Sequence, residues 1–292
     1  MPPTALAAAI PPPRSVMQIG HWGRRIEAKL RFAVGGGRTV LTAQRMPYPF
    51  HVTRVFHLDV ARPDLATLYL QSASGGIYRG DRLALAIEVG TGAAVHLTTQ
   101  SATIVHDTRE SPAEQVTRIV TARGAVALLT PEPLVLFPGA DVTSRTEIMV
   151  SAGATVIATD GFAWHDPAGE GRPLARYTSA TVVRSEAGVL LADRGSVAGA
   201  ELAGKASPLG PYRAAGTLLV LGRGADRLDP AALELHVSST GCFAGLGRAP
   251  NNAGWAGRVL AFDGGTLRRG LVAAFAIAVE SVLGFVPAPR RK

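Results

Sequence analysis

The chain has 292 residues, of which 47% are hydrophobic and 18% charged. This composition supports one or two domains with a large core and excludes an intrinsically disordered protein. The formal net charge is +8, carried mainly by arginines that are scattered singly along the chain. Arginine pairs well with carboxylates, and no basic run is interleaved with aromatic residues, so the charge favours an acidic protein partner over nucleic acid.

The first 22 residues are expected to form a flexible arm rather than a signal peptide. No basic leader precedes their short alanine stretch, and three prolines close it.

The single cysteine, Cys242, excludes an intramolecular disulfide and a multi-cysteine zinc site, so a reducing, cytoplasmic location fits best. The most apolar stretch, residues 270–286, is short and contains Glu280, so we expect no membrane span.

Two strands are predicted around a tight glycine turn in the first third of the chain. Hydrophobic residues alternate with other residues over 83–89 and again over 93–97, and Gly90-Thr91-Gly92 separates the two runs. Alternation with a period of two is typical of strands, so the pattern predicts a β-hairpin.

The same pattern returns three times, over residues 117–130, 147–159 and 181–193. The turn glycines stand at 92, 124, 153 and 188, in steps of 32, 29 and 35 residues. A period of about 30 residues indicates one structural unit stacked repeatedly. We therefore predict a mainly β fold of layered antiparallel strands and hairpins, in one elongated domain over residues 23–292.

One or two helices are expected near the C-terminus. Residues Leu267–Leu283 have helical character, with Gly264 and Gly265 before them and Gly284 closing the segment. Strands are expected from about Leu30 to Val237.

The glycine-rich segment Gly75–Asp81, GGIYRGD, resembles a phosphate-binding loop only superficially. A Walker loop ends in Lys and Ser or Thr before a helix, whereas this segment ends in Asp81 before a predicted strand. Two interpretations remain: a glycine turn between strands, or a functional loop that displays Asp81 to a partner.

Four stretches together resemble the urease accessory protein UreD family, also called UreH. They are GGGRTVLTAQRMPYPFHVTRVF, GGIYRGDRL, LTTQSAT and PEPLVLFPGA, which occur in the family's order between about Arg31 and Ala140. Weaker repeats extend the resemblance to about Ser196. The chain departs from the family pattern at Ile104, at His106, over residues 161–177 and at its PAPRRK ending.

The resemblance implies a non-enzymatic assembly factor for urease. Members of this family bind apo-urease and the accessory proteins UreF and UreG, and the GTPase UreG powers nickel insertion. No tightly bound cofactor is expected, although nickel could pass through the protein. By the same resemblance, a partner-binding loop is expected at Gly75, Gly76, Gly80, Thr98, Thr99 and Gln100.

Five residues are candidates for weak nickel ligands during such a transfer. Asp81 follows the glycine turn, and Glu132 lies between two prolines. His106 and His165 are each followed by an aspartate, and a proline after Asp166 favours a loop in which His165 and Asp166 could chelate together. For Glu132, the alternative is a solvated strand edge. A handover requires few fixed ligands, because a tight site would trap the ion.

Two other function classes remain open from the residues alone. A β-fold hydrolase could use Asp81 and Glu132 as an acid and base pair, although only 6% of the residues are aromatic and no nucleophile elbow is present. A nucleic-acid-binding β protein rests only on the basic composition, and a steep salt dependence of duplex binding would identify it.

Overall fold

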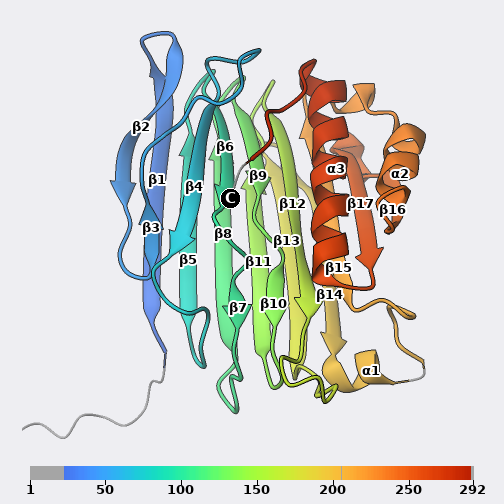
Figure 1. Cartoon of the computed structure of the whole chain (residues 1–292). Coiled ribbons are helices and arrows are strands. Elements are labelled where there is room, and N and C mark those ends of the chain that lie inside the picture. The colour runs from blue at the N-terminus through green and yellow to red at the C-terminus, as the bar shows by residue number, and fades with distance from the viewer. Residues whose placement is uncertain (1–22, 205, 291–292) are drawn as a thin grey trace, which may run out of the picture.

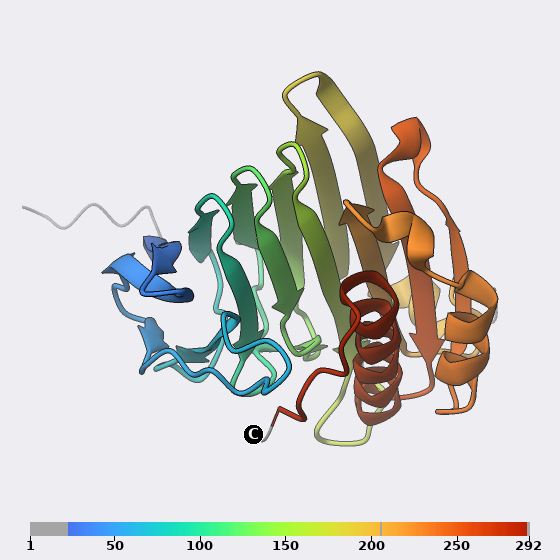
Figure 2. The same cartoon turned by 90° about the horizontal axis from the view of Figure 1, so that it is seen from above.

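The computed structural model describes residues 23–204 and 206–290. The arm predicted at residues 1–22 lies outside these ranges. The described residues form two large sheets that face each other, with helices against the outer side of one sheet (Figures 1 and 2). The prediction of a mainly β fold with helices near the C-terminus is confirmed.

The first sheet has seven strands in the order β14-β13-β11-β8-β5-β1-β2 among the described residues. Their bounds are β1 Arg25–Gly35, β2 Arg38–Arg45, β5 Arg82–Val89, β8 Ala113–Thr121, β11 Asp141–Met149, β13 Arg176–Ser185 and β14 Gly188–Ala198.

The second sheet follows the order β16-β17-β15-β12-β9-β6-β4-β3, and the short strands β7 and β10 pair beside β12. Their bounds are β3 Phe50–Val52, β4 Ala66–Ser72, β6 Ala94–Thr99, β7 Ile104–Val105, β9 Val126–Thr130, β10 Leu134–Leu136, β12 Thr155–Trp164, β15 Ala214–Gly222, β16 Phe243–Arg248 and β17 Gly254–Ala261.

The stacked repeats predicted from the glycine spacing are present as parallel coils. In the first sheet Arg82 pairs with Glu114, Glu114 with Thr143, and Thr143 with Thr178. These offsets of 32, 29 and 35 residues equal the spacings of the turn glycines. Each coil therefore lies directly on the previous one, and the glycine turns form a row along one end of the stack, seen from above in Figure 2.

The predicted hairpins and their antiparallel pairing are wrong for three of the four repeats. Strand β5 belongs to the first sheet and β6 to the second, so the turn after Val89 connects two sheets instead of two neighbours in one sheet. The turns at Gly124 and Gly153 do the same, and the strands that they join pair in parallel with those of adjacent coils. Only β13 and β14, around Gly188, form an antiparallel hairpin among these repeats.

The helix predicted within Leu267–Leu283 is confirmed as α3, which spans Gly264–Leu283. Its first turn begins one residue after Asp263, whose carboxylate accepts a hydrogen bond from the Thr266 N–H at 2.8 Å. Gly284 ends it with φ of 77°, the left-handed conformation that favours glycine. The further helices are α1 (Gly199–Ala203), α2 (Pro230–Ser238) and the single turns η1 (Ala225–Arg227) and η2 (Pro250–Asn252), while β16 and β17 extend the β structure beyond Val237.

Apolar side chains gather in three clusters. One lies between the sheets near the glycine turns and includes Ala93, Ala125 and Ala154. A second fills the opposite end of the sandwich, and a third lies between the second sheet and helices α2 and α3. Polar residues separate the first two clusters inside the sandwich, which places polar groups where a core is normally apolar. None of the described helices is long and apolar enough to cross a membrane.

Candidate functional site

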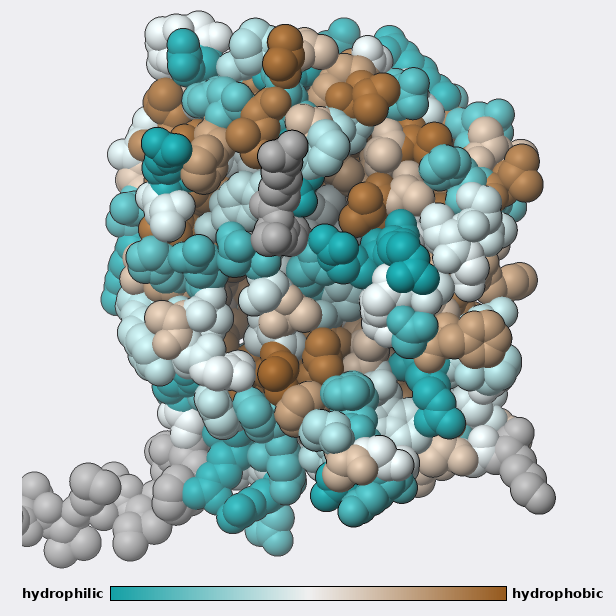
Figure 3. All heavy atoms as spheres, in the orientation of Figure 1, coloured by the Kyte–Doolittle hydropathy of each residue, from teal (hydrophilic) through white to brown (hydrophobic). Residues whose placement is uncertain are grey.

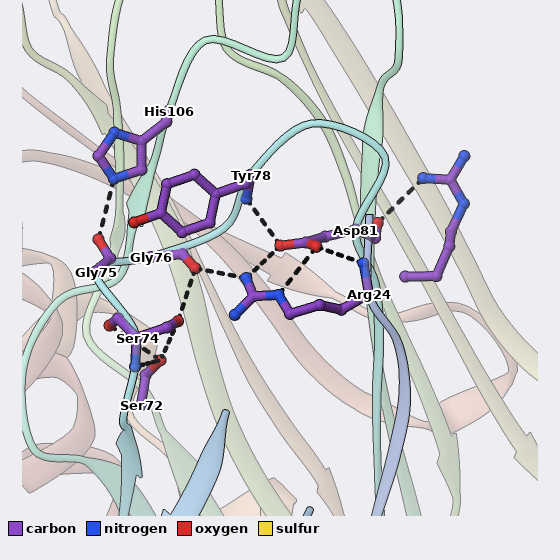
Figure 4. A network of polar contacts seen from close by, with 9 residues as sticks. Arg24, Ser72, Ser74, Gly75, Gly76, Tyr78, Asp81 and His106 are labelled. Carbon is purple, nitrogen blue, oxygen red and sulfur yellow. Dashed lines mark hydrogen bonds and ion pairs between the residues drawn. The ribbon is translucent and has the colours of Figure 1, made fainter. Parts of the chain in front are cut away.

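The Gly75–Asp81 loop is a structural turn closed by an ion pair between the half-buried Arg24 and the buried Asp81 (Figure 4). Asp81 is 1% exposed, so the interpretation of a functional loop that displays Asp81 to a partner is wrong. Its oxygens accept hydrogen bonds from the Arg24 side chain and from the N–H groups of Arg24 and Tyr78. Burial raises the pKa of Asp81, but these donors outweigh it and hold the pKa below its ordinary value.

A close contact with the backbone requires glycine at position 76 of this loop. Gly76 has φ of 142°, and a Cβ on it would lie 2.2 Å from the carbonyl oxygen of Ile104. Gly76 is buried, whereas Gly75 is exposed and Gly80 half-buried. The Gly75 carbonyl accepts a hydrogen bond from Nε2 of His106, whose ring stacks on Tyr78 at 4.6 Å (Figure 4). His106 therefore supports the loop.

The second part of the predicted partner loop lies within strand β6 and just after it. Thr98 is 1% exposed and donates to the Thr130 carbonyl, so it is not available on a surface loop. Thr99 accepts a hydrogen bond from the N–H of Glu132 at 2.9 Å. Gln100 is exposed. Of these three residues, only Gln100 has the exposure that a partner contact requires.

A cavity of about 350 Å³, lined by both polar and apolar residues, enters the sandwich between the two sheets. We call it the interior cavity; the polar residues at its inner end are Gln115, Thr117, Ser144 and Asp160. Gly75, Gly76, Thr99 and Glu132 line its outer part. The structure therefore brings four of the sequence-predicted residues to one cavity, but Asp81 is not among the residues that line it.

Asp160 occupies the inner end of the interior cavity. It lies on β12 between Ala158 and Phe162, which both face the sandwich interior. The same carboxylate also lines a second cavity of about 320 Å³, the distal cavity, together with Tyr177 and Arg258. Asp160 therefore stands where two cavities in the sandwich meet.

The charges around Asp160 are arranged across the two sheets. Burial raises the pKa of Asp160, while a hydrogen bond with Thr217 and the charge of Arg258 act in the opposite direction. Arg258 donates to Thr217 at 3.1 Å and to Asp193 at 2.5 Å, which joins the second sheet to the first. Burial also raises the pKa of Tyr177, so its phenol stays protonated and can donate a hydrogen bond.

Glu132 lies at the junction of three cavities. It lines the interior cavity, a groove at the start of α3 and a second groove farther along α3. Its side chain is 8% exposed and pairs with Arg268 of α3 at 2.9 Å. The alternative of a solvated strand edge is therefore wrong, because Glu132 is a mostly buried carboxylate between the sheet and the helix.

The groove at the start of α3, here the helix groove, also contains His165 and Asp166. Both residues follow β12 in a loop, as the sequence predicts. The Asp166 carboxylate, however, accepts hydrogen bonds from the Arg172 side chain and from the N–H groups of Arg172 and Ala168, which hold its pKa well below the ordinary range. His165 is exposed. Within residues 23–204 and 206–290 there is no group of three or more metal-ligating side chains.

Sequence reasoning missed Asp160, Ser144 and Thr117. Each lies two positions from a buried apolar residue on the same face of its strand, although Thr117 also neighbours Gln115 and Ser144 also neighbours Thr146. A polar residue at an expected core position was the signal that could have identified them.

Comparisons of the sequence with a family model and with known proteins all point to the same family. A sequence model of the UreD urease accessory protein family matches residues 24–292. Urease accessory protein UreD 1 of Methylorubrum extorquens (strain PA1) is 47% identical over 272 residues, which cover 92% of each chain. Urease accessory protein UreD 3 of Bradyrhizobium sp. (strain ORS 278) is 48% identical over 273 residues, covering 92% of this chain and 96% of that protein. Urease accessory protein UreD 1 of Pseudomonas syringae pv. syringae (strain B728a) is 33% identical over 261 residues, covering 88% and 91%.

Proposed function

This chain belongs to the UreD urease accessory protein family, and from that premise we propose that it assists urease maturation by giving nickel a polar passage through its sandwich. It acts without turnover of its own, in the cytoplasm, bound to apo-urease and to the accessory proteins UreF and UreG. The family supports the urease role, and the polar side chains that line the interior cavity support the passage.

The oxygen atoms along the interior cavity suit an ion in transit. Nickel(II) accepts carboxylate, hydroxyl, imidazole and water ligands, and Asp160 and Glu132 are carboxylates at the two ends of this cavity. Hydroxyl groups of Thr117 and Ser144, on the first sheet, line the inner end together with Asp160. Few charges along the path keep each binding step weak, so the ion is released as readily as it is bound.

Glu132 is the proposed portal of this passage. It borders both the interior cavity and the helix groove, where exposed His165 could deliver or receive a hydrated ion. The ion pair with Arg268 neutralises Glu132 while the passage is empty, so a cation must displace the guanidinium to enter. The shared position of Glu132 on these cavities is the observation that carries the proposal.

Asp81 has no place in this passage. Its carboxylate is fully engaged by Arg24 and the loop N–H groups, and the interior cavity does not reach it. His106 likewise supports the loop through the Gly75 carbonyl.

The test replaces each carboxylate by its neutral isostere in cells that also produce urease and its other accessory proteins. We expect Asp160→Asn and Glu132→Gln to lower the nickel content of recovered urease severalfold, while pull-down shows intact complexes. Glu147→Gln is the matched control, because Glu147 pairs with Arg118 on the outer face of the first sheet.

Two results would separate the passage from the family role. Normal nickel loading with both carboxylate variants would exclude a route through this sandwich. Normal loading without the chain, at physiological nickel and bicarbonate, would exclude a role in urease maturation altogether.

A further inference from the structure

The C-terminal residues Phe285–Arg290, here called the strap, cross the outer face of the second sheet. In Figure 1 they leave the upper end of α3 and run back in front of β9 and β6. Together with α3 they enclose the groove farther along the helix, here the strap groove, of about 450 Å³. Its floor contains His96, Thr98 and Thr130. Figure 3 shows that polar and apolar residues are intermixed on this face.

The strap is held by a guanidinium group inserted into the protein. Arg290 donates from Nη2 to Oδ2 of Asp59 at 2.7 Å, and the Asp59 side chain is 0% exposed. Oδ1 of Asp59 accepts a hydrogen bond from the Ala288 N–H at 2.7 Å. Nη1 of Arg290 also donates to the Ala288 carbonyl, so the strap folds back on the ion pair.

A buried histidine, His96, joins Asp59 in binding the Arg290 side chain; these two residues are here called the receptor for Arg290. Nδ1 of His96 lies 2.9 Å from Nε of Arg290, and Nε2 lies 2.7 Å from the Thr130 hydroxyl. Because the guanidinium Nε can only donate, Nδ1 must accept, and the ring is neutral with its proton on Nε2. Protonation of Nδ1 would set an N–H against the N–H of Arg290 and place two cations in contact.

We propose that the strap is an acid-operated cover, which is closed while His96 is neutral and opens when His96 becomes protonated. An open strap would leave the His96 ring in water, where an imidazole changes charge between about pH 5 and 8, so a proton favours the open strap as the pH falls through this range. A released strap exposes the floor of the strap groove and one side of Glu132, which lines the same groove. This proposal does not depend on the passage of nickel.

The charges around His96 favour this behaviour. Among the described residues, β4 contributes Thr67, β9 contributes Thr130 and α3 contributes the ring of Phe275 at 4.9 Å. The charged groups that share the groove or the receptor are Asp59, Glu132, Arg268, Arg269 and Arg290. Asp59 is paired with Arg290, and Glu132 with Arg268. A protonated His96 would therefore lie next to the positive charge of Arg290, while the carboxylates of Asp59 and Glu132 are already paired with arginines.

The experiment measures hydrogen exchange of the C-terminal peptide in the full-length protein between pH 8 and pH 5, corrected for the intrinsic pH dependence of exchange. Ala288 is the reporter, since its N–H is bound to Asp59 only in the closed strap. We expect protection to fall by up to about tenfold per pH unit as the pH decreases, as one linked proton requires.

Three variants identify the groups. Arg290→Met should leave the strap without protection from hydrogen exchange at every pH. Whatever the level of protection in His96→Gln, that level should no longer depend on pH. His51→Gln is the matched control, because His51 lies on β3 with its ring bonded to Gln71 and should keep the response of the unaltered protein. Equal protection of the unaltered protein at pH 8 and pH 5, or a persisting response in His96→Gln, would overturn the proposal.

Discussion

Arg24 and Asp81 are 57 residues apart and hold the start of β1 against the glycine loop. The Asp81 Oδ1 atom accepts from the N–H of Arg24 at 2.9 Å and from its Nε at 3.1 Å, while Oδ2 accepts from the Tyr78 N–H at 2.8 Å. Since β1 pairs in parallel with β5 directly after Asp81, this ion pair sets the register of the first two coils.

We predict that Asp81→Asn lowers the free energy of unfolding by about 2 kcal/mol at pH 7, because it leaves a half-buried guanidinium without its counter-charge. The pKa of Asp81 is lower in the folded than in the unfolded protein, so its contribution is present above about pH 4 and is lost as the pH falls through the folded value. Denaturant unfolding at pH 7 and pH 3 checks this. A difference between variant and unaltered protein that is equal at both values would contradict it.

Gly76→Ala and Gly92→Ala should differ although both glycines have positive φ. At Gly92, with φ of 67°, a Cβ meets nothing within 4 Å, so only backbone strain of about 1 kcal/mol applies. At Gly76 the Cβ would also collide with the Ile104 backbone, and we expect a loss of roughly 3 kcal/mol or more. Thermal unfolding of both variants measures the difference, and equal losses would show that the loop can move.

Thr67→Val should preserve or increase stability. The Thr67 hydroxyl is fully buried on β4 and has no hydrogen-bond partner among the described residues. Replacing it by a methyl group of similar shape removes an unmet polar group, for a gain of up to about 1 kcal/mol. A clear loss in the unfolding midpoint would indicate that an ordered water bonds to this hydroxyl.

Asp160→Asn should stabilise the isolated protein near neutral pH. Burial raises the pKa of Asp160, so the ionised form costs stability above the folded pKa, and this cost disappears as the carboxyl becomes protonated in acid. We expect a gain on the order of 1 kcal/mol at pH 7 that vanishes toward pH 4. Such a gain, combined with lower nickel loading, would show that the carboxylate is kept at a cost in stability.

The repeats could be predicted from the sequence because the spacing between successive turn glycines equals the offset between paired residues of adjacent strands. The way in which the strands are connected could not be predicted, since a tight glycine turn fits both a hairpin in one sheet and a link between two sheets. The burial of strand β6 distinguishes these two possibilities. Residues 94–98 are buried on both faces, between the sandwich interior and the outer cover of the sheet, as a central parallel strand requires.

The candidate site was partly predictable. Two prolines around Glu132 indicated a fixed direction, but its ion pair joins residues 136 positions apart, which no local pattern reveals. Asp81 was misjudged because an aspartate after a glycine turn is usually solvated, and the partner that buries it lies in a segment without a distinctive motif. Predicting that Asp160 faces the interior would have required continuing the alternation of β12 through a polar residue.

The ion pair of Asp59 and Arg290 has a consequence for synthesis of the chain. Strands in adjacent coils are about 30 residues apart, so most of the sandwich can assemble while translation continues. Asp59 lies in one of the first loops of the sandwich to be synthesised, whereas its partner Arg290 follows 231 residues later. A chain that terminates before residue 290 therefore carries a desolvated carboxylate without its cation. The ion pair of Asp59 and Arg290 therefore forms after the strands of the sandwich have stacked.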